Sequence, residues 1–279
     1  MTEPESGVLY LVATPIGNLS DLSERALRVL KGADVIAAED TRVTSKLMER
    51  YGFSKPMFPY HRHNLERGGA QLLEKLKSGE RVALVTDAGT PGISDPGEDA
   101  VALCAAEGIR TVAIPGACAA VTALTVSGLP GGRFCFEGFL SAQPSARAKQ
   151  LRALAAEKRT VIFYEAPHRL RETLADMRAA FGDTRRISLC RELTKLNEEI
   201  LRTDLADAVR YFEQTEPRGE FVLVVEGAPE EDAFWSDMTV AEHVAFYVDD
   251  GMTENDAMKA AAKDRGVAKS EIYKEIKKK

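Results

Sequence analysis

The stretch 84–97 constrains the fold of this chain more than any other. The apolar pair Leu84-Val85 gives way to Thr86-Asp87-Ala88-Gly89-Thr90-Pro91-Gly92-Ile93-Ser94-Asp95-Pro96-Gly97, a run of small, turn-forming and acidic residues. This change is typical of a buried strand that ends in a ligand-binding loop, because glycine permits backbone conformations and close approaches that a Cβ atom forbids. Asp87 and Asp95 add acceptors for ribose hydroxyls, amines or a helix N-terminus.

A second break of the same kind lies at Ile114-Pro115-Gly116-Ala117-Cys118-Ala119, again after a short apolar run. Two strand-to-loop breaks this close together in the chain predict one cleft.

Short β-rich runs alternate with segments of helical spacing in the first part of the chain. We expect strands at 8–13, 35–38, 82–86 and 111–114, and helices that include 21–30 and 71–76. Continuous apolar strands between helices predict an α/β fold with a mainly parallel sheet covered on both faces.

A linker signal, Ser127-Gly128-Leu129-Pro130-Gly131-Gly132, follows a small-residue helix expected at 117–126. Beyond it, strands at 134–140, 160–164, 186–190 and 221–225 and helices near 146–156, 170–181 and 205–212 predict a second α/β unit with a more mixed sheet. From about Met238 the pattern is helical, and Thr253 with Asp256 resembles an N-terminal cap. The predicted domains are therefore 1–130, 131–230 and a small helix-turn-helix-like appendage, 231–279, that either binds nucleic acid or serves as a packing tail.

Composition narrows the class of protein. A chain of 279 residues with 44% hydrophobic residues can bury a large core, and no apolar window approaches the length of a membrane span. The net charge of −6 argues against a surface that is wholly basic for nucleic acid, although arginines concentrated in the second half leave room for a local phosphate-binding face. The lack of a membrane span and the acidic segment 1–7 predict a cytoplasmic protein with no membrane contact. The four cysteines form no Cys-x-x-Cys pair, so we expect neither a metal site nor a disulfide framework.

Several motifs in this order resemble one family. They are Thr14-Pro15-Ile16-Gly17-Asn18-Leu19, Glu39-Asp40-Thr41-Arg42, Asp87-Ala88-Gly89-Thr90-Pro91, Ile114-Pro115-Gly116, Phe163-Tyr164-Glu165-Ala166-Pro167-His168-Arg169 and Arg191-Glu192-Leu193-Thr194-Lys195. The chain resembles the tetrapyrrole-methylase superfamily from about Val8 to Gly227, and within it the small-subunit ribosomal RNA 2′-O-methyltransferases, whose small C-terminal helical domain the tail also resembles. The resemblance implies two α/β domains with S-adenosylmethionine in the cleft between them, a homodimer, and methylation of a cytidine 2′-hydroxyl in the decoding region of 16S rRNA.

The resemblance also implies which residues contact the cofactor, mainly through their backbone. Asp87, Ala88 and Gly89 correspond to the loop at the amino-acid end or ribose, Cys118 and Ala119 to the turn after the fourth strand, and Glu165 to the residue that closes the pocket from the second domain. Pro15 and Ile93 complete the expected cofactor-binding set. Cys118 departs from the family, which commonly has serine there, so any hydroxyl contact is lost or replaced by a weaker thiol.

Methyl transfer to a ribose hydroxyl needs the nucleophile in line with the methyl group and an acceptor for its proton. Glu39, Asp40, His61 and His168 are the candidate bases, and the sequence does not rank them. Arg42, Arg169 and Lys195 can grip phosphate or favour deprotonation through their charge. The expected catalytic set is therefore Glu39, Asp40, Arg42, His168, Arg169 and Lys195, with 16S rRNA or the small ribosomal subunit as partner. Phe163 and Tyr164 alternate along a strand, so at most one should face the ligand.

Two other function classes compete with this interpretation. One is a methyltransferase that acts on a corrin or porphyrin precursor with the same cofactor fold. The other is a noncatalytic ribosome-binding or assembly factor that retains the fold, which the intact loops disfavour.

Overall fold

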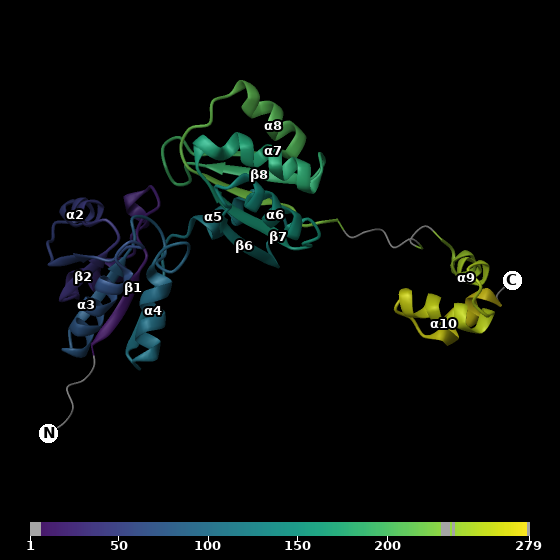
Figure 1. Cartoon of the computed structure of the whole chain (residues 1–279), viewed down its shortest axis with the longest axis horizontal. Helices are drawn as coiled ribbons and strands as arrows, with labels where there is room; N and C mark the ends of the chain where they lie inside the picture. Colours follow the sequence, from purple (N-terminus) through teal and green to yellow (C-terminus); the bar gives the residue numbers. More distant parts are fainter. Residues whose placement is uncertain (1–6, 230–234, 236–237, 278–279) are drawn as a thin grey trace. The chain divides into compact units, whose positions relative to one another are not determined.

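The computed structural model describes residues 7–229, 235 and 238–277, which form two compact units divided after Ala228. The larger unit contains two five-stranded sheets, and the smaller one is helical (Figure 1). The fold is therefore α/β, as expected from the sequence. No helix in these ranges is long and apolar enough to cross a membrane.

The first sheet is parallel throughout, with strand order β3-β2-β4-β1-β5. Its strands are β1 (Val8–Val12), β2 (Val35–Ala38), β3 (Met57–Pro59), β4 (Arg81–Val85) and β5 (Arg110–Ile114). The helical segments that follow these strands are η1 (Leu19–Asp21) and α1 (Glu24–Gly32), α2 (Thr41–Arg50), α3 (Leu65–Lys77), α4 (Gly97–Ala106) and α5 (Ala119–Ser127).

Alternation along β4 explains why both faces of this sheet are covered. Val82 and Leu84 are buried in one apolar cluster, whereas Ala83 and Val85 are buried in another. Since successive side chains of a strand point to opposite faces, an uninterrupted apolar strand requires a helical layer on each side.

The second sheet is mixed, with order β6-β7-β10-β8-β9, and only the β6–β7 pair is parallel. Its strands are β6 (Phe134–Phe139), β7 (Thr160–Glu165), β8 (Arg186–Arg191), β9 (Glu199–Asp204) and β10 (Phe221–Val225). Residues of α6 (Pro144–Leu154), α7 (Leu170–Phe181) and α8 (Leu205–Gln214) pack on one face, and the short η2 (Pro167–Arg169) precedes α7 (Figure 1).

Helix α5 covers the opposite face of this second sheet. Its residues Ala120, Ala123 and Leu124 are buried with Ile162 and Val224, and the helix ends at Gly128, whose φ of 77° terminates it in the left-handed region. Helix α5 begins directly after the loop that follows β5, so it connects the first sheet to the second. The predicted division at 130 places α5 in the first domain, although α5 packs on the second sheet. That division stays a prediction.

The smaller unit contains α9 (Val240–Asp249), α10 (Glu254–Asp264) and α11 (Lys269–Ile276) around a small core with Val244, Ala261 and Ile272. The expected cap is confirmed, because the Thr253 side chain accepts a hydrogen bond from the Asp256 backbone N–H. The helix-turn-helix-like role of this appendage stays a prediction.

Candidate active site

The loop after β4 is held against the loop after β1. Thr14 N–H donates to the Gly89 carbonyl at 2.9 Å, and Gly89 N–H donates to the Thr14 carbonyl at 3.1 Å. Gly89 has a φ of 88°, a conformation in which a side chain would be strained. This pairing fixes Asp87, Ala88 and Gly89 where the strand ends.

The loop after β5 joins the same place. The Thr90 hydroxyl donates to the Ala117 carbonyl at 2.8 Å, which ties the two loops together. The Ala120 N–H at the start of α5 donates to the Tyr164 hydroxyl at 3.2 Å, so strand β7 also contributes. The predicted meeting of the two sequence breaks is thus present in the structure.

Together these segments line a cleft with a volume of about 600 Å³. Its walls come from both sheets of the larger unit. The first sheet contributes Ile16, Glu39, 86–90, 93–95, Cys118 and Ala119, and the second contributes Phe139, 164–167, Cys190, Glu192, Leu193, Lys195 and 220–222. A volume of this size suits a small-molecule or cofactor site.

The sequence-derived candidates divide into two groups. Those on the cleft wall are Glu39, Asp87, Ala88, Gly89, Ile93, Cys118, Ala119, Glu165 and Lys195, whereas Pro15, Asp40, Arg42, His168 and Arg169 do not line it. Phe163 is fully buried in the core behind β7 while Tyr164 faces the cleft, which confirms the expectation from their alternation.

Glu39 and Asp87 place two carboxyl groups on one side of the cleft. The Asp87 N–H donates to Glu39 Oε2 at 3.4 Å, and Asp87 Oδ1 accepts from the Asp40 N–H at 3.1 Å. Burial raises the pKa of both carboxyl groups above their usual values, and the neighbouring acids Asp87 and Asp95 raise the pKa of Glu39 further. A carboxylate with a raised pKa is a better proton acceptor than an ordinary one.

Asp40 is occupied outside the cleft. Its carboxylate caps α2 by accepting the Arg42 N–H at 2.8 Å, and it also accepts hydrogen bonds from the Arg42 guanidinium. These hydrogen bonds lower the pKa of Asp40 to about 2. Of Glu39 and Asp40, Glu39 is therefore the one that combines a place on the cleft wall with a raised pKa, a combination that it shares with Asp87.

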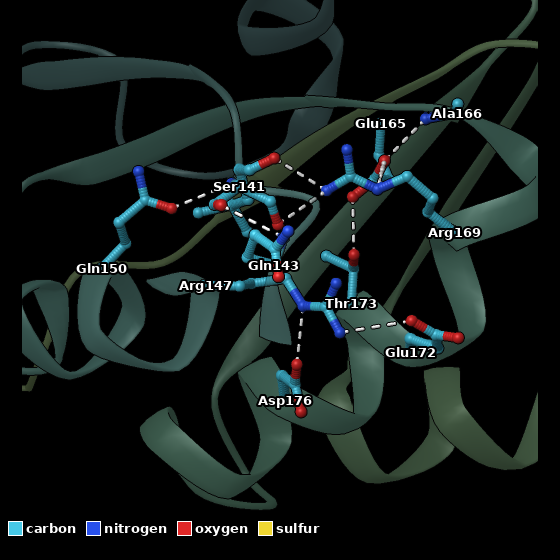
Figure 2. Close-up of polar contacts among 11 residues, drawn as sticks. Ser141, Gln143, Arg147, Gln150, Glu165, Ala166, Arg169, Glu172, Thr173 and Asp176 are labelled. Atoms are coloured by element: carbon cyan, nitrogen blue, oxygen red, sulfur yellow. Dashed lines mark hydrogen bonds and ion pairs between the residues drawn. The ribbon is translucent and has the colours of Figure 1, made fainter. Parts of the chain in front are cut away.

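Glu165 is buried at the end of β7 and organises the turn into η2. Its Oε2 accepts from the Thr173 hydroxyl at 2.6 Å, its Oε1 accepts from the Ala166 N–H at 2.8 Å, and Arg169 Nε lies 3.5 Å from Oε1. Arg169 also donates to the Leu140 carbonyl at 2.7 Å. Figure 2 shows this network, in which Arg169 lies beside Glu165 and extends toward Ser141, while Thr173 contacts the other oxygen of Glu165.

The arginine-rich second half also contains side chains that are committed to ion pairs. Buried Arg147 lies 2.6 Å from Asp176 and 3.3 Å from Glu172, joining α6 to α7 (Figure 2). Arg147 thus joins α6 to α7, and Arg169 is held by Glu165 and the Leu140 carbonyl. These two arginines of the second half therefore have a structural role.

Lys195 is the predicted cation that does reach the cleft. Its Nζ lies 2.9 Å from Glu192 and 2.8 Å from Glu220. Although burial disfavours the ammonium ion, these hydrogen bonds raise the pKa of Lys195. Glu192 and Thr194 have φ values of 50° and 66°, so the loop that carries Lys195 holds a strained backbone beside the cleft.

The cleft residues that the sequence interpretation missed include Phe139, Glu192 and Glu220. Phe139 lies 5.5 Å from Tyr164 between ring centroids, in an edge-on arrangement, and its side chain is 55% exposed. Glu192 lies in the motif from Arg191 to Lys195 and could have been found there, whereas no local pattern marks Phe139 or Glu220.

Gly17 provides a test of how closely the two halves of the larger unit meet. A Cβ atom on Gly17 would lie 2.4 Å from Lys195 Cγ, 2.8 Å from Thr194 Oγ1 and 3.1 Å from the Leu193 carbonyl oxygen. We expect Gly17→Ala to lower the free energy of unfolding by about 1–3 kcal/mol, as overpacking does. Gly32→Ala is the matched control because no atom lies within 4 Å of its Cβ position. Equal urea midpoints for the two variants would contradict this contact.

The class of protein is shown by its similarity to known proteins. The family model of tetrapyrrole (corrin/porphyrin) methylases matches residues 8–209, and the chain belongs to that family. The structure of the methyltransferase CobJ has a TM-score of 0.62 at 22% identity and covers 80% of this chain and 95% of its own. A uroporphyrin-III C-methyl transferase from Thermus thermophilus, complexed with S-adenyl homocysteine, has a TM-score of 0.58 at 20% identity, with 79% and 97% covered.

Sequence relatives specify the branch. The proteins named ribosomal RNA small subunit methyltransferase I from Halalkalibacterium halodurans and Bacillus subtilis are 48% and 47% identical to this chain, each over 96% of it and 94% of the relative. The protein of the same name from Escherichia coli O157:H7 is 49% identical over 81% of this chain and 80% of its own. The chain is thus a member of the ribosomal RNA small subunit methyltransferase I family.

Proposed function

We propose that this protein transfers the methyl group of S-adenosylmethionine to the 2′-hydroxyl of a cytidine in the decoding region of 16S rRNA. The observation that supports the proposal is the cleft itself, which Glu39 and Asp87 from the first sheet line together with Phe139 and Tyr164 from the second. Membership of the family supports rRNA as the acceptor, and the name of these relatives specifies the small subunit.

The residues of the cleft fit the proposed cofactor. Asp87 offers acceptor oxygens for ribose hydroxyls or an ammonium group, and the loop backbone at Ala88 and Gly89 allows a close approach. Ile93, Cys118 and Ala119 supply an apolar surface. Pro15 stays in the proposed cofactor-binding set because of the family resemblance, although it does not line the cleft. S-adenosylmethionine supplies a methyl group on a sulfonium sulfur, which transfers without a metal.

Glu39 is assigned the role of proton acceptor. In the proposed step the 2′-hydroxyl gives its proton to a Glu39 carboxylate oxygen, the ribose oxygen bonds to the methyl carbon, and the carbon–sulfur bond breaks to leave a neutral thioether. Glu165 holds the turn at Ala166 and Pro167 in place, and Lys195 positions the opposite wall. Arg42 and His168, which lie outside the cleft wall, are proposed to contact RNA phosphate, while Asp40 orients Arg42 and Arg169 holds Glu165.

The proposal includes two features carried by the family resemblance. The protein acts as a homodimer, and it works in the cytoplasm on 16S rRNA or on the assembled small subunit. Sedimentation equilibrium at micromolar concentration tests the homodimer. We expect the mass of two chains, and a mass near 30.5 kDa, that of one chain, would contradict the dimer.

The experiment that tests the acceptor uses methyl-labelled S-adenosylmethionine. Unmodified small ribosomal subunits and a uroporphyrinogen-type tetrapyrrole are offered in parallel to the full chain. We expect label in the RNA alone. Label in the tetrapyrrole would support the small-molecule alternative, and cofactor binding without any acceptor would favour an assembly factor.

A further inference from the structure

A hydrogen-bonded loop beside the cleft carries a leucine that is fully exposed. Leu196 is 100% exposed, whereas the other large apolar side chains described reach at most 55%, at Phe139. Single exposed apolar residues are ordinary on protein surfaces. What distinguishes Leu196 is its position directly after Lys195, which lines the cleft.

The loop on which Leu196 stands is fixed on several sides. The Lys195 N–H donates to the Glu192 carbonyl at 3.0 Å and the Glu198 N–H donates to the Lys195 carbonyl at 3.1 Å, which makes two successive turns. The Thr194 N–H donates to Glu198 Oε2 at 2.6 Å. The Lys195 ammonium group lies between the carboxylates of Glu192 and Glu220, which adds two ion pairs to the contacts of this loop.

The first sheet braces the same loop. The Asn18 N–H donates to Thr194 Oγ1 at 3.1 Å, and Gly17 packs directly against Lys195. The positive φ values of Glu192 and Thr194 add strain that these contacts must offset. A strained, braced loop that presents an apolar tip next to a binding cleft is an arrangement suited to contact with a partner.

The proposed substrate explains what such a tip would meet. Glu39 and the loops at 86–90 line a cleft, so a ribose within a stacked RNA strand must leave the stack for its 2′-hydroxyl to reach them. Proteins that unstack bases insert apolar side chains between base steps, and a displaced base gains stacking on aromatic side chains. The exposed ring of Phe139 on the cleft wall offers such a stacking surface.

We propose that Leu196 is a positioning residue that inserts into the RNA stack beside the target cytidine and holds its nucleotide in the cleft. This inference rests on the proposed function, because it requires an RNA acceptor. It adds to that function a residue and a step, the unstacking of the target nucleotide.

The test compares Leu196→Ala, Leu196→Met and Asn197→Ala, all at exposed positions where truncation removes no core contact. We expect Leu196→Ala to lower kcat/KM on unmodified small subunits by about tenfold or more. Leu196→Met should stay near wild type because it retains an apolar tip, and so should the neighbouring Asn197→Ala. The Kd for S-adenosylmethionine should be unchanged in all three.

A fluorescence measurement separates unstacking from other effects of the loop. A decoding-region RNA with 2-aminopurine next to the target cytidine should brighten on binding wild type or Leu196→Met with S-adenosylhomocysteine, and should stay dim with bound Leu196→Ala. Equal brightening and equal kcat/KM for Leu196→Ala and wild type would overturn the inference, as would an equal loss in Asn197→Ala. Failure of wild type to methylate RNA would instead overturn the proposed function.

Discussion

Asp87→Ala should raise the Kd for S-adenosylmethionine about 10- to 150-fold, the equivalent of losing a hydrogen bond to a charged group. Asp87 stands on the cleft wall where β4 ends, on a loop held by the Thr14–Gly89 pairing. Its carboxylate also accepts the Asp40 N–H, so alanine would remove the proposed ligand contact and a hydrogen bond to the loop after β2. Isothermal titration calorimetry measures the effect.

The thermal stability of two variants, Asp87→Ala and Asp87→Asn, is the control, because a loss of cofactor binding counts only if the variant is folded. Burial raises the pKa of Asp87, so the native state binds the proton more tightly than the unfolded chain does. This term favours folding at low pH and is lost as the pH rises through the raised pKa, so at neutral pH the ionised group opposes folding. Asp87→Asn should therefore not lower the Tm, and tight cofactor binding by a well-folded Asp87→Ala would remove Asp87 from the site.

Glu39→Gln should lower kcat by about 10²–10⁴-fold, the typical contribution of a general base, with little change in the Kd for the cofactor. Glutamine keeps the shape and can still accept the Asp87 N–H, but it cannot take the proton. Because burial and then the neighbouring acids raise the pKa of Glu39, activity should fall as the pH drops through a value above the usual 4.5. That acidic limb should vanish in Glu39→Gln.

Asp40→Ala is the matched control for Glu39→Gln because the two carboxylates are adjacent in the chain. Asp40 caps α2 and orients Arg42, so its loss should cost about 1 kcal/mol of stability and raise the KM for RNA while kcat is retained. A large fall in kcat for Asp40→Ala, or wild-type kcat in Glu39→Gln, would transfer the role of base away from Glu39.

Loops at strand ends were the part of the site that the sequence could predict. Residues 87–89 and 118–119 are marked by an abrupt change from apolar to small and polar residues, and parallel strands bring such changes to one edge. The alternation of Phe163 and Tyr164 likewise predicted that only one ring faces the cleft, and the structure assigns Phe163 to the core. These are local signals, and local geometry decides them.

Other features depend on contacts between distant residues and could not be predicted. Edge strand β9 has only Ile200 and Leu201 as apolar residues, so its sequence is typical of a loop, and β3 is short and ends in proline. The sequence could not show that Arg169 faces Glu165 and the Leu140 carbonyl, or that Glu220 clamps Lys195. A charged side chain in a motif has the same local pattern whether it meets a ligand or a neighbouring strand.

The most direct test of the proposed function is the position of the methyl group on the RNA. A 2′-O-methyl group removes the nucleophile of alkaline cleavage, so a partial alkaline ladder lacks one band at the modified nucleotide. After incubation of unmodified small subunits with the protein and S-adenosylmethionine, we expect one missing band, at a cytidine of the decoding region. A complete ladder from RNA that carries label would show methylation of a base and would contradict 2′-O transfer.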